Sequence, residues 1–380
     1  MKLLHTSDWH LGIGFRGADY EEDQRFAIDE ICRVAEKEQV DGILLAGDVF
    51  DKSIASREAI SLYNETMTRI CRTMKLPVYM IAGNHDGAER LSQCSELLKN
   101  SGLYIAGALT REVQSVNIGD VDIYFLPWVS TDKVKSVFPE RAEEADSIEK
   151  AYSIVLDEYR KKFVEGHKHI LIAHAYIVNA QTSESDRSAV IGTATMVSAS
   201  VFDGFDYVAL GHLHGPQQIT ETICYSGTPM AYSFGTEEKQ QKGVVILDTD
   251  TMKTEVVPLK QLHKRTTLRG TYEELLKADY DEDILKGYVR LEVTDRYIGK
   301  EARAVLEEKY ENLLEVNGKN LERENDRITM TLEELKKFES DPEMIFINYC
   351  KDVLEEEATE HLKELFRNAV ENYAKGENEE

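Results

Sequence analysis

Five short apolar segments of this chain end in residues that could bind a metal ion. Their ends deliver two carboxylates, one amide and four imidazoles: Asp8, His10, Asp48, Asn84, His174, His212 and His214. This mixed oxygen and nitrogen set contains no thiolate, which suits Mn²⁺ or Fe²⁺ and is tolerable for Zn²⁺. The sequence therefore predicts a metal centre.

The number of candidate ligands indicates how many ions the centre holds. Seven are too many for one ion that must also bind a substrate, so we expect two ions with Asp48 as the natural bridge. Two carboxylates and two divalent cations give the site a net charge of about +2. This charge can hold a phosphate and an activated water together. Two cations also suit in-line displacement at phosphorus, so phosphoester hydrolysis is the expected reaction.

The histidine beside the amide ligand is a candidate for proton transfer. His85 follows Asn84 immediately and must point elsewhere. We predict that His85 contacts the phosphate and protonates the leaving oxygen, because an alkoxide without a proton departs poorly.

Other residues near these segments have both a structural and a functional interpretation. His5 alternates with buried neighbours on the first strand, so we expect a structural role. Trp9 and Trp128 could stack on bases, but packing is favoured. Five basic residues close in sequence to the ligands could contact phosphates or be solvated charges, with neither favoured: Arg16, Lys52, Arg57, Arg90 and Arg187.

The elements that must position the ligands follow from the apolar pattern. Residues 1–130 alternate strands at 1–6, 42–47 and 77–82 with helices around 20–38, 56–73 and 89–100, which predicts an α/β sheet with ligands at its carboxyl edge. Gly119 and Asp120 separate two strands that predict a hairpin in a second sheet. We expect a helix around 140–164 before the His174 strand, and 222–227 with 243–248 as a closing pair of strands.

The pattern restarts after the ligand-bearing region. Residues 261–338 predict a small α+β module: strands near 264–270, at 288–293 and before 330, and helices at 271–277 and 300–314. Residues 339–380 predict a helical tail. One apolar face of this tail follows helical spacing: Leu362, Leu365, Phe366, Ala369, Val370 and Tyr373. Because acidic residues surround that face, docking on a partner is favoured over packing on the chain's own body.

Composition limits the class of protein. With 380 residues, 42% of them hydrophobic, the chain can bury a large core in two domains plus an appendage. Its formal charge of -25 argues against finding nucleic acid through an overall field. Residues 339–380 hold thirteen acidic against four basic side chains, a net of -9, so the remainder carries -16 and must capture any anionic substrate locally.

Cysteine usage and hydropathy indicate the compartment. Five widely spaced cysteines with no Cys-x-x-Cys pair fit reduced thiols. The first motif begins almost at Met1, and no apolar run reaches the roughly 20 residues that span a bilayer. We expect a soluble cytoplasmic protein with no membrane contact.

The motifs taken together resemble a known family. Asp8-x-His10, Gly47-Asp48-x-x-Asp51, Gly83-Asn84-His85-Asp86, a lone His174 after a strand and Gly211-His212-x-His214 occur in the order found in the calcineurin-like metallophosphoesterases. The resemblance implies a four-layer αββα sandwich. The segments 4–12 and 183–187 look more specifically like the SbcD family, the nuclease subunits of SbcCD complexes.

The SbcD resemblance implies a domain plan and a function. Residues 1–260 would form the nuclease domain, 261–338 its capping domain and 339–380 a helical region that docks on an SbcC-type ATPase. The implied activities are 3′ to 5′ exonuclease on double-stranded DNA and endonuclease on single strands or hairpins, dependent on Mn²⁺. Fe²⁺, Mg²⁺ or Zn²⁺ are possible substitutes. A homodimer within a heterotetramer, associated with the nucleoid and acting in DNA repair, recombination and replication, is implied as well.

Individual roles also follow from the resemblance. One manganese would be held by Asp8, His10, Asp48 and His214, and the other by Asp48, Asn84, His174 and His212. His85 would be the catalytic histidine. The chain departs from the archaeal members at Asp51, where they place a second active-site histidine, and Asp51 cannot donate a proton as an imidazolium would.

Two other hypotheses are weighed against the nuclease. A metallophosphoesterase acting on a small phosphoester or a phosphoprotein would need neither the capping module nor the tail. A non-catalytic scaffold that kept the fold is disfavoured by the complete ligand set.

Overall fold

The computed structural model describes residues 1–15, 18–183, 185–188 and 196–318, together with 360, 362, 363 and 365–367. The chain divides into two units, 1–319 and 320–380, and the first contains the predicted metal centre. The predicted tail at 339–380 lies almost entirely outside the described residues, as do Arg16 and the side chain of Arg187.

Two six-stranded sheets form the body of the first unit. The first has the order β16-β15-β1-β4-β5-β6, in which β1, β4, β5 and β6 are parallel and β15 and β16 antiparallel to their neighbours. Its strands are β1 (Lys2–Thr6), β4 (Gly42–Ala46), β5 (Val78–Ile81), β6 (Leu103–Ala106), β15 (Gly243–Asp248) and β16 (Lys253–Pro258).

The second sheet has the order β13-β14-β12-β9-β8-β7 and a parallel centre of β14, β12, β9 and β8. Its strands are β7 (Ser115–Ile118), β8 (Val121–Leu126), β9 (Lys168–His174), β12 (Tyr207–Gly211), β13 (Gln217–Gln218) and β14 (Ile223–Tyr225). β7 and β8 form the expected hairpin around Gly119 and Asp120.

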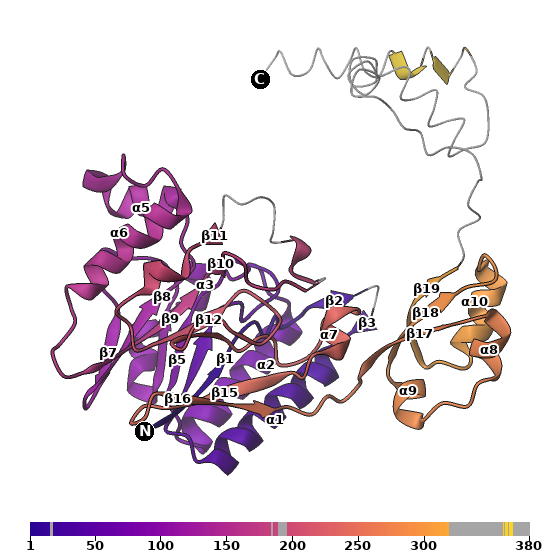
Figure 1. Cartoon of the computed structure of the whole chain (residues 1–380), viewed down its shortest axis with the longest axis horizontal. Helices are drawn as coiled ribbons and strands as arrows, with labels where there is room; N and C mark the ends of the chain where they lie inside the picture. The colour runs from indigo at the N-terminus through magenta and orange to yellow at the C-terminus, as the bar shows by residue number, and fades with distance from the viewer. Residues whose placement is uncertain are drawn as a thin grey trace. The chain divides into compact units, whose positions relative to one another are not determined.

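The two sheets pack face to face, with helices on their outer faces (Figure 1). Leu44 and Ile81 of the first sheet meet Phe125 and Ile172 of the second in one buried cluster. Helices α1 (Glu21–Glu38) and α2 (Arg57–Thr68) cover the outside of the first sheet, and α6 (Ile148–Arg160) covers the second. This arrangement confirms the predicted four-layer αββα sandwich.

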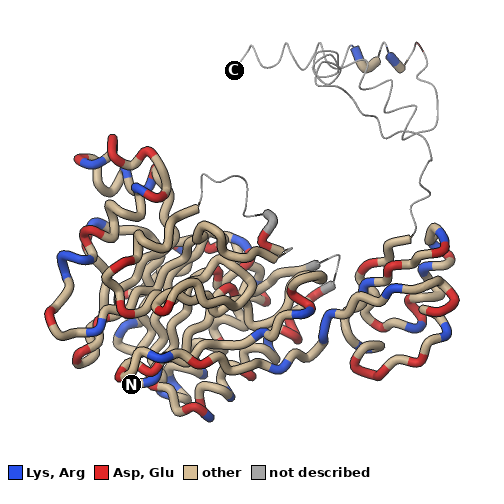
Figure 2. The backbone as a smooth tube through the Cα atoms, in the orientation of Figure 1, with Lys and Arg blue, Asp and Glu red and all other residues tan. Residues whose placement is uncertain are grey.

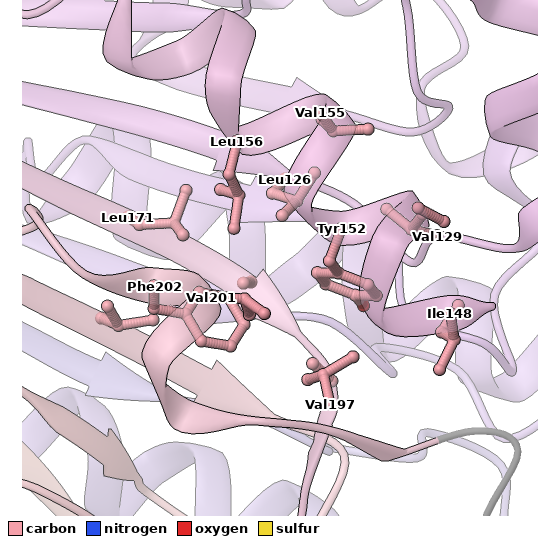
Figure 3. Close-up of a cluster of buried hydrophobic side chains, with 14 of the residues drawn as sticks. Leu126, Val129, Ile148, Tyr152, Val155, Leu156, Leu171, Val197, Val201 and Phe202 are labelled. Atoms are coloured by element: carbon pink, nitrogen blue, oxygen red, sulfur yellow. The ribbon is translucent and has the colours of Figure 1, made fainter. Parts of the chain in front are cut away.

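The outer core of the second sheet supports a predicted ligand directly. Leu156 and Val155 of α6 pack with Leu171 of β9, and Tyr152 lies beside Phe202 (Figure 3). The Tyr152 hydroxyl donates to the main-chain oxygen of His174 at 2.8 Å. Packing of α6 therefore fixes the end of the strand that carries this histidine.

A separate three-stranded parallel sheet follows the sandwich. It contains β17 (Arg265–Gly270), β18 (Tyr288–Val293) and β19 (Asn312–Asn317), with helices α8 (Tyr272–Lys277), α9 (Glu282–Lys286) and α10 (Lys300–Glu307). The helix predicted at 300–314 ends at Glu307, because Leu313 and Leu314 are needed as buried residues of β19. The other predicted elements up to residue 318 are present, and α9 is an additional helix that the sequence pattern did not predict.

Three other sequence predictions differ from the structure. The helix expected around 89–100 is broken into α3 (Ala88–Leu91), α4 (Ser95–Leu98) and a 3-10 turn, because Cys94 is left-handed with φ 61°. The helix expected around 140–164 begins only at Ile148, where Ser147 caps it. The strands near 222–227 and 243–248 do not pair, since β14 belongs to the second sheet and β15 to the first.

The remaining elements are short. They are β2 (Gly14–Phe15), β3 (Ala18–Asp19), β10 (Tyr176–Ile177), β11 (Met196–Val197), α5 (Thr131–Val137), α7 (Thr236–Lys239), a π turn (Arg69–Thr73) and 3-10 turns at Pro139–Arg141, Ser185–Ser188 and Ala199–Phe202. Charged residues gather on the outer helices and loops (Figure 2). None of the helices in the described part of the chain has the length and apolarity that a bilayer crossing demands.

Candidate metal centre

The predicted ligands converge from both sheets. Four come from loops that follow strands of the first sheet, Asp8, His10, Asp48 and Asn84; three come from the second sheet, His174, His212 and His214. All are buried except Asn84, which is exposed. Main-chain bonds tie the first loops together, because Asp8 N donates to Gly47 O at 3.0 Å and His10 N to Asp48 O at 2.9 Å.

The backbone turns sharply where it presents these side chains. Asp8, His10, Asp48 and His212 have φ values of 53°, 44°, 50° and 106°. Non-glycine residues with positive φ are uncommon, and such strain gathers at functional sites where the surroundings enforce it. The turn after β5 needs glycine, since a Cβ on Gly83 would lie 2.1 Å from Asp48 Oδ1.

One half of the centre lies around Asn84. Its Oδ1 is 3.0 Å from His174 Nε2 and 3.0 Å from His212 Nδ1. The other ring nitrogen of His174 donates to the carbonyl of Ala46 at 2.8 Å, so Nε2 is the nitrogen that faces the Asn84 amide oxygen. Asp48 Oδ2 lies 3.3 Å from the same Nε2.

The other half lies around His10. Its Nε2 is 3.8 Å from Asp48 Oδ2, and ligand atoms of Asp8, His10 and Asp48 all lie within 4.8 Å of one another. Asp48 is thus close to both halves. Both ring nitrogens of His10 are buried and have no hydrogen-bond partner among the described residues. An orphaned buried nitrogen is costly, and a cation would satisfy the ring nitrogen of His10 that carries the lone pair, so the residues fit a metal site.

Burial and crowded charges shift several pKa values at the centre. Burial raises the pKa of Asp8 to about 6, with the Asp48 carboxylate adding to the effect. Burial alone would lower the pKa of His174, but Asp48 outweighs it and raises the value to about 9. Burial and the neighbouring His174 lower the pKa of His212 to about 3. Without a cation, one proton therefore sits between His174 and Asp48.

His85 faces the same small cleft of about 90 Å³, which His10, Asp51 and His214 also line. Its Nδ1 lies 2.8 Å from the carbonyl of Asp51 and donates to it, because a carbonyl only accepts. Its main-chain N–H donates to Asp48 Oδ1 at 2.9 Å. The ring is half-buried, and Nε2 is the nitrogen left for another partner.

Comparison of the sequence with known proteins shows the family to which this chain belongs. Residues 1–216 match the sequence profile described as calcineurin-like phosphoesterase. The SbcD component of the nuclease SbcCD from Staphylococcus epidermidis is 34% identical over 318 residues, which cover 83% of this chain and 84% of that protein. The protein of the same name from Staphylococcus saprophyticus is 34% identical over 296 residues, covering 77% and 78%. The chain belongs to the SbcD family of calcineurin-like phosphoesterases.

Membership of this family makes the chain a metal-dependent hydrolase and implies divalent cations. Among solved structures, a Thermus thermophilus protein aligns with 68% of this chain and 99% of its own at 13% identity, with a TM-score of 0.40. The fold assignment rests on the profile match and on the sheet topology above.

The structural interpretations of His5 and Trp9 hold in this SbcD-family chain. His5 is buried between the sheets, with Nδ1 2.9 Å from the Tyr207 hydroxyl and Nε2 3.1 Å from Leu210 O, which confirms a structural role. Trp9 is buried and donates to Thr6 Oγ1 at 3.0 Å. Trp128 stacks on the His212 ring, with centroids 5.3 Å apart.

The basic residues near the loops show no common pattern. Arg90 donates to the carbonyl of Ser53 at 3.0 Å, and Arg57 lies 3.5 Å from Glu58. Lys52 is exposed. Their contact with phosphate stays a prediction.

Several supporting residues were missed by the sequence reasoning. Asp86 accepts hydrogen bonds from the main-chain N–H groups of Gly83, Val49 and Phe50 at 2.9, 3.2 and 2.9 Å. Its place inside the Gly83-Asn84-His85-Asp86 motif was a signal that could have found it. Glu237 and Lys242, which lie behind His214, belong to no motif.

Proposed function

We propose that this chain is a divalent-metal-dependent DNA nuclease that acts as a subunit with an SbcC-type ATPase. The observation that carries the proposal is the cluster of seven ligand residues around Asp48, in a chain that two proteins named as nuclease subunits match at 34% identity over most of its length. The substrate is DNA, cleaved from the ends of duplexes and within single strands or hairpins.

Two Mn²⁺ ions are the proposed cofactors, with Fe²⁺, Mg²⁺ or Zn²⁺ as possible substitutes. The mixed carboxylate, amide and imidazole set supports this choice. One ion would be held by Asp8, His10, Asp48 and His214, and the other by Asp48, Asn84, His174 and His212. The position of Asp48, within 3.8 Å of His10 Nε2 and 3.3 Å of His174 Nε2, supports its role as the bridge.

The bound cations would supply the positive charge that activates water and stabilises both the attacking and the leaving oxygen. The charges of the ligand residues determine how much of that positive charge is left over. Because Asn84 is neutral, Asp8 and Asp48 are the only carboxylates among the seven proposed ligands, and the positive charge that they leave attracts a phosphodiester. His85 then protonates the leaving oxygen through Nε2, while its Nδ1–H stays on the Asp51 carbonyl at 2.8 Å and fixes the ring.

The domain plan is part of the proposal. Residues 1–260 would form the nuclease domain and 261–338 the capping domain, which the separate sheet of β17, β18 and β19 supports. Residues 339–380 would dock on the ATPase, and two copies of the chain would form a dimer that bridges DNA ends. Truncation after Glu339 should preserve Mn²⁺-dependent cleavage and abolish ATPase binding; unchanged affinity for the ATPase would show that the tail is not the dock.

The purified chain tests the activity directly. End-labelled duplex and hairpin DNA should be cut in Mn²⁺, and the pattern with Mg²⁺, Fe²⁺ and Zn²⁺ gives the metal preference. Asp48→Asn should abolish cleavage. His167→Gln, which alters a histidine bonded to Asp122 at 2.9 Å on another part of the second sheet, should leave it unchanged. Hydrolysis of a small phosphomonoester with no cleavage of linear duplex would favour the small-substrate hypothesis instead.

A further inference from the structure

A buried ion pair lies directly behind one of the predicted ligands. Glu237 of α7 and Lys242 are 1% and 3% exposed, and Lys242 Nζ lies 2.9 Å from Glu237 Oε2. A buried pair of this kind often contributes less stability than apolar residues of the same volume would. The contacts of the pair, and not its own stability, therefore bear on what it does at this place.

The side chain of His214 is connected to this pair through one hydroxyl. Ser185 Oγ lies 2.5 Å from His214 Nδ1 and is also hydrogen-bonded to Glu237 Oε1. A carboxylate can only accept, so the Ser185 proton points to Glu237, and the Ser185 oxygen accepts a proton donated by His214 Nδ1. The order of donation is thus His214 to Ser185 to Glu237.

The main chain of the same histidine is held by the other member of the pair. Lys242 Nζ donates to His214 O at 2.8 Å and to Thr228 Oγ1 at 2.9 Å. Both the ring and the backbone of His214 thereby depend on one ion pair. Asp186 adds a bond from His214 N at 3.1 Å, but its oxygen is 3.6 Å from Nδ1, so Ser185 is the nearer partner of the ring.

We propose that Glu237 is a positioning residue for the metal ligand His214, acting through Ser185, with Lys242 as its counterion. The relay keeps the ring proton on Nδ1 and leaves the Nε2 lone pair for a cation. A second partner that fixes the tautomer of a ligating histidine commonly changes metal affinity by 10- to 100-fold. The inference rests on the proposed function only in assigning His214 as a ligand.

The carboxylate itself is rigidly held, which a positioning role requires. Tyr232 N donates to Glu237 Oε2 at 3.0 Å, and Ser233 Oγ donates to Oε1 at 2.5 Å. Ser233 thus shares the carboxylate with Ser185, but within the described part of the chain no hydrogen bond joins Ser233 to His214. This difference offers a matched control.

Titration of the full-length protein with Mn²⁺ alone, followed by the electron paramagnetic resonance of free and bound ion, tests the relay. Ser185→Ala should weaken one of the two Mn²⁺ binding steps about 10- to 100-fold and leave the other within about threefold. Ser185→Thr keeps the hydroxyl and should restore binding. Ser233→Ala should bind both ions as the unaltered chain does.

The carboxylate needs a double variant, because Glu237→Gln alone leaves the Lys242 charge buried without its partner. Glu237→Gln with Lys242→Met removes the pair without leaving a charge, and should weaken the same step as Ser185→Ala. Unchanged binding in Ser185→Ala, or equal weakening in Ser233→Ala, would overturn the inference. If the double variant does not fold, Ser185→Ala decides alone. Two tightly bound ions without DNA cleavage would refute the nuclease and leave the relay standing.

Discussion

Cation binding at the centre should release a proton, and its strength should depend steeply on pH. The metal-free site holds that proton on His174, whose pKa is raised to about 9 by Asp48 against the opposing effect of burial. A cation needs the neutral imidazole with its lone pair free. Raising the pH from 6.5 to 8.5 is therefore expected to strengthen binding.

The size of this pH effect on cation affinity follows from the raised pKa of His174. At pH 7 only about 1% of a group with a pKa of about 9 is neutral, so the proton competes with the cation throughout this range. Affinity should rise about tenfold per pH unit and level off above pH 9, which is about 1.4 kcal/mol per unit. Asp8, with a pKa of about 6, is mostly ionised above pH 6.5 and adds little to the slope.

Isothermal titration calorimetry with Mn²⁺ measures both quantities. Repeating the titration at pH 7 in buffers of different ionisation enthalpy counts the protons released, and we expect about one for the ion that contacts His174. His167→Gln serves as the control and should keep the same slope. An affinity that stays flat between pH 6.5 and 8.5, or no proton released, would refute the charge arrangement inferred for the metal-free centre.

Three further changes test single contacts. His85→Gln should keep both Mn²⁺ ions by calorimetry and lose cleavage by about 100-fold or more, and loss of metal would contradict its role. Gly211→Ala would place a Cβ 2.0 Å from Ala46 O, so thermal unfolding should show a loss of about 1 to 3 kcal/mol, and an unchanged midpoint would contradict the close approach. Trp128→Ala removes the ring stacked on His212 and should weaken Mn²⁺ binding by about 3- to 10-fold, whereas loss of DNA affinity alone would indicate base stacking instead.

The location of the site could be predicted from the sequence because each ligand follows a strand. Apolar runs before Asp8, Asp48 and His174 predicted buried strands, and parallel strands bring their carboxyl ends to one edge of a sheet. The structure brings these residues together as expected. Their assignment as ligands stays a prediction that the binding experiments address.

The sheet membership of the later strands could not be predicted in the same way. β14 and β15 are close in sequence, but β14 pairs with β12 and β15 pairs with β1, more than 200 residues earlier. The alternation of apolar residues shows which face of a strand is buried, but it does not show which strand lies beside it in the sheet. The break at Cys94 was equally hidden, because a left-handed residue other than glycine has no clear sequence signal.

Glu237 shows a second limit of sequence reasoning. In the sequence it stands between Thr236 and Glu238 and resembles any solvated acid of a helix. Its partners come from a segment 52 residues earlier and from Lys242, so only the folded chain reveals that it is buried. Supporting residues of a metal centre need a charge or hydroxyl at the right place, which no fixed spacing encodes.

The contacts between the sheets explain why the centre is tied to the fold as a whole. His174 of the second sheet donates to Ala46 O of the first, and His5 of the first sheet bonds to Tyr207 and Leu210 of the second. His212 N of the second sheet also donates to Asp8 Oδ1 of the first at 3.0 Å, so ligands from each sheet are held by contacts with the other sheet and not by their own loops alone. Because packed cores shift between discrete arrangements and do not deform continuously, a change in the inter-sheet core should alter both halves of the centre together.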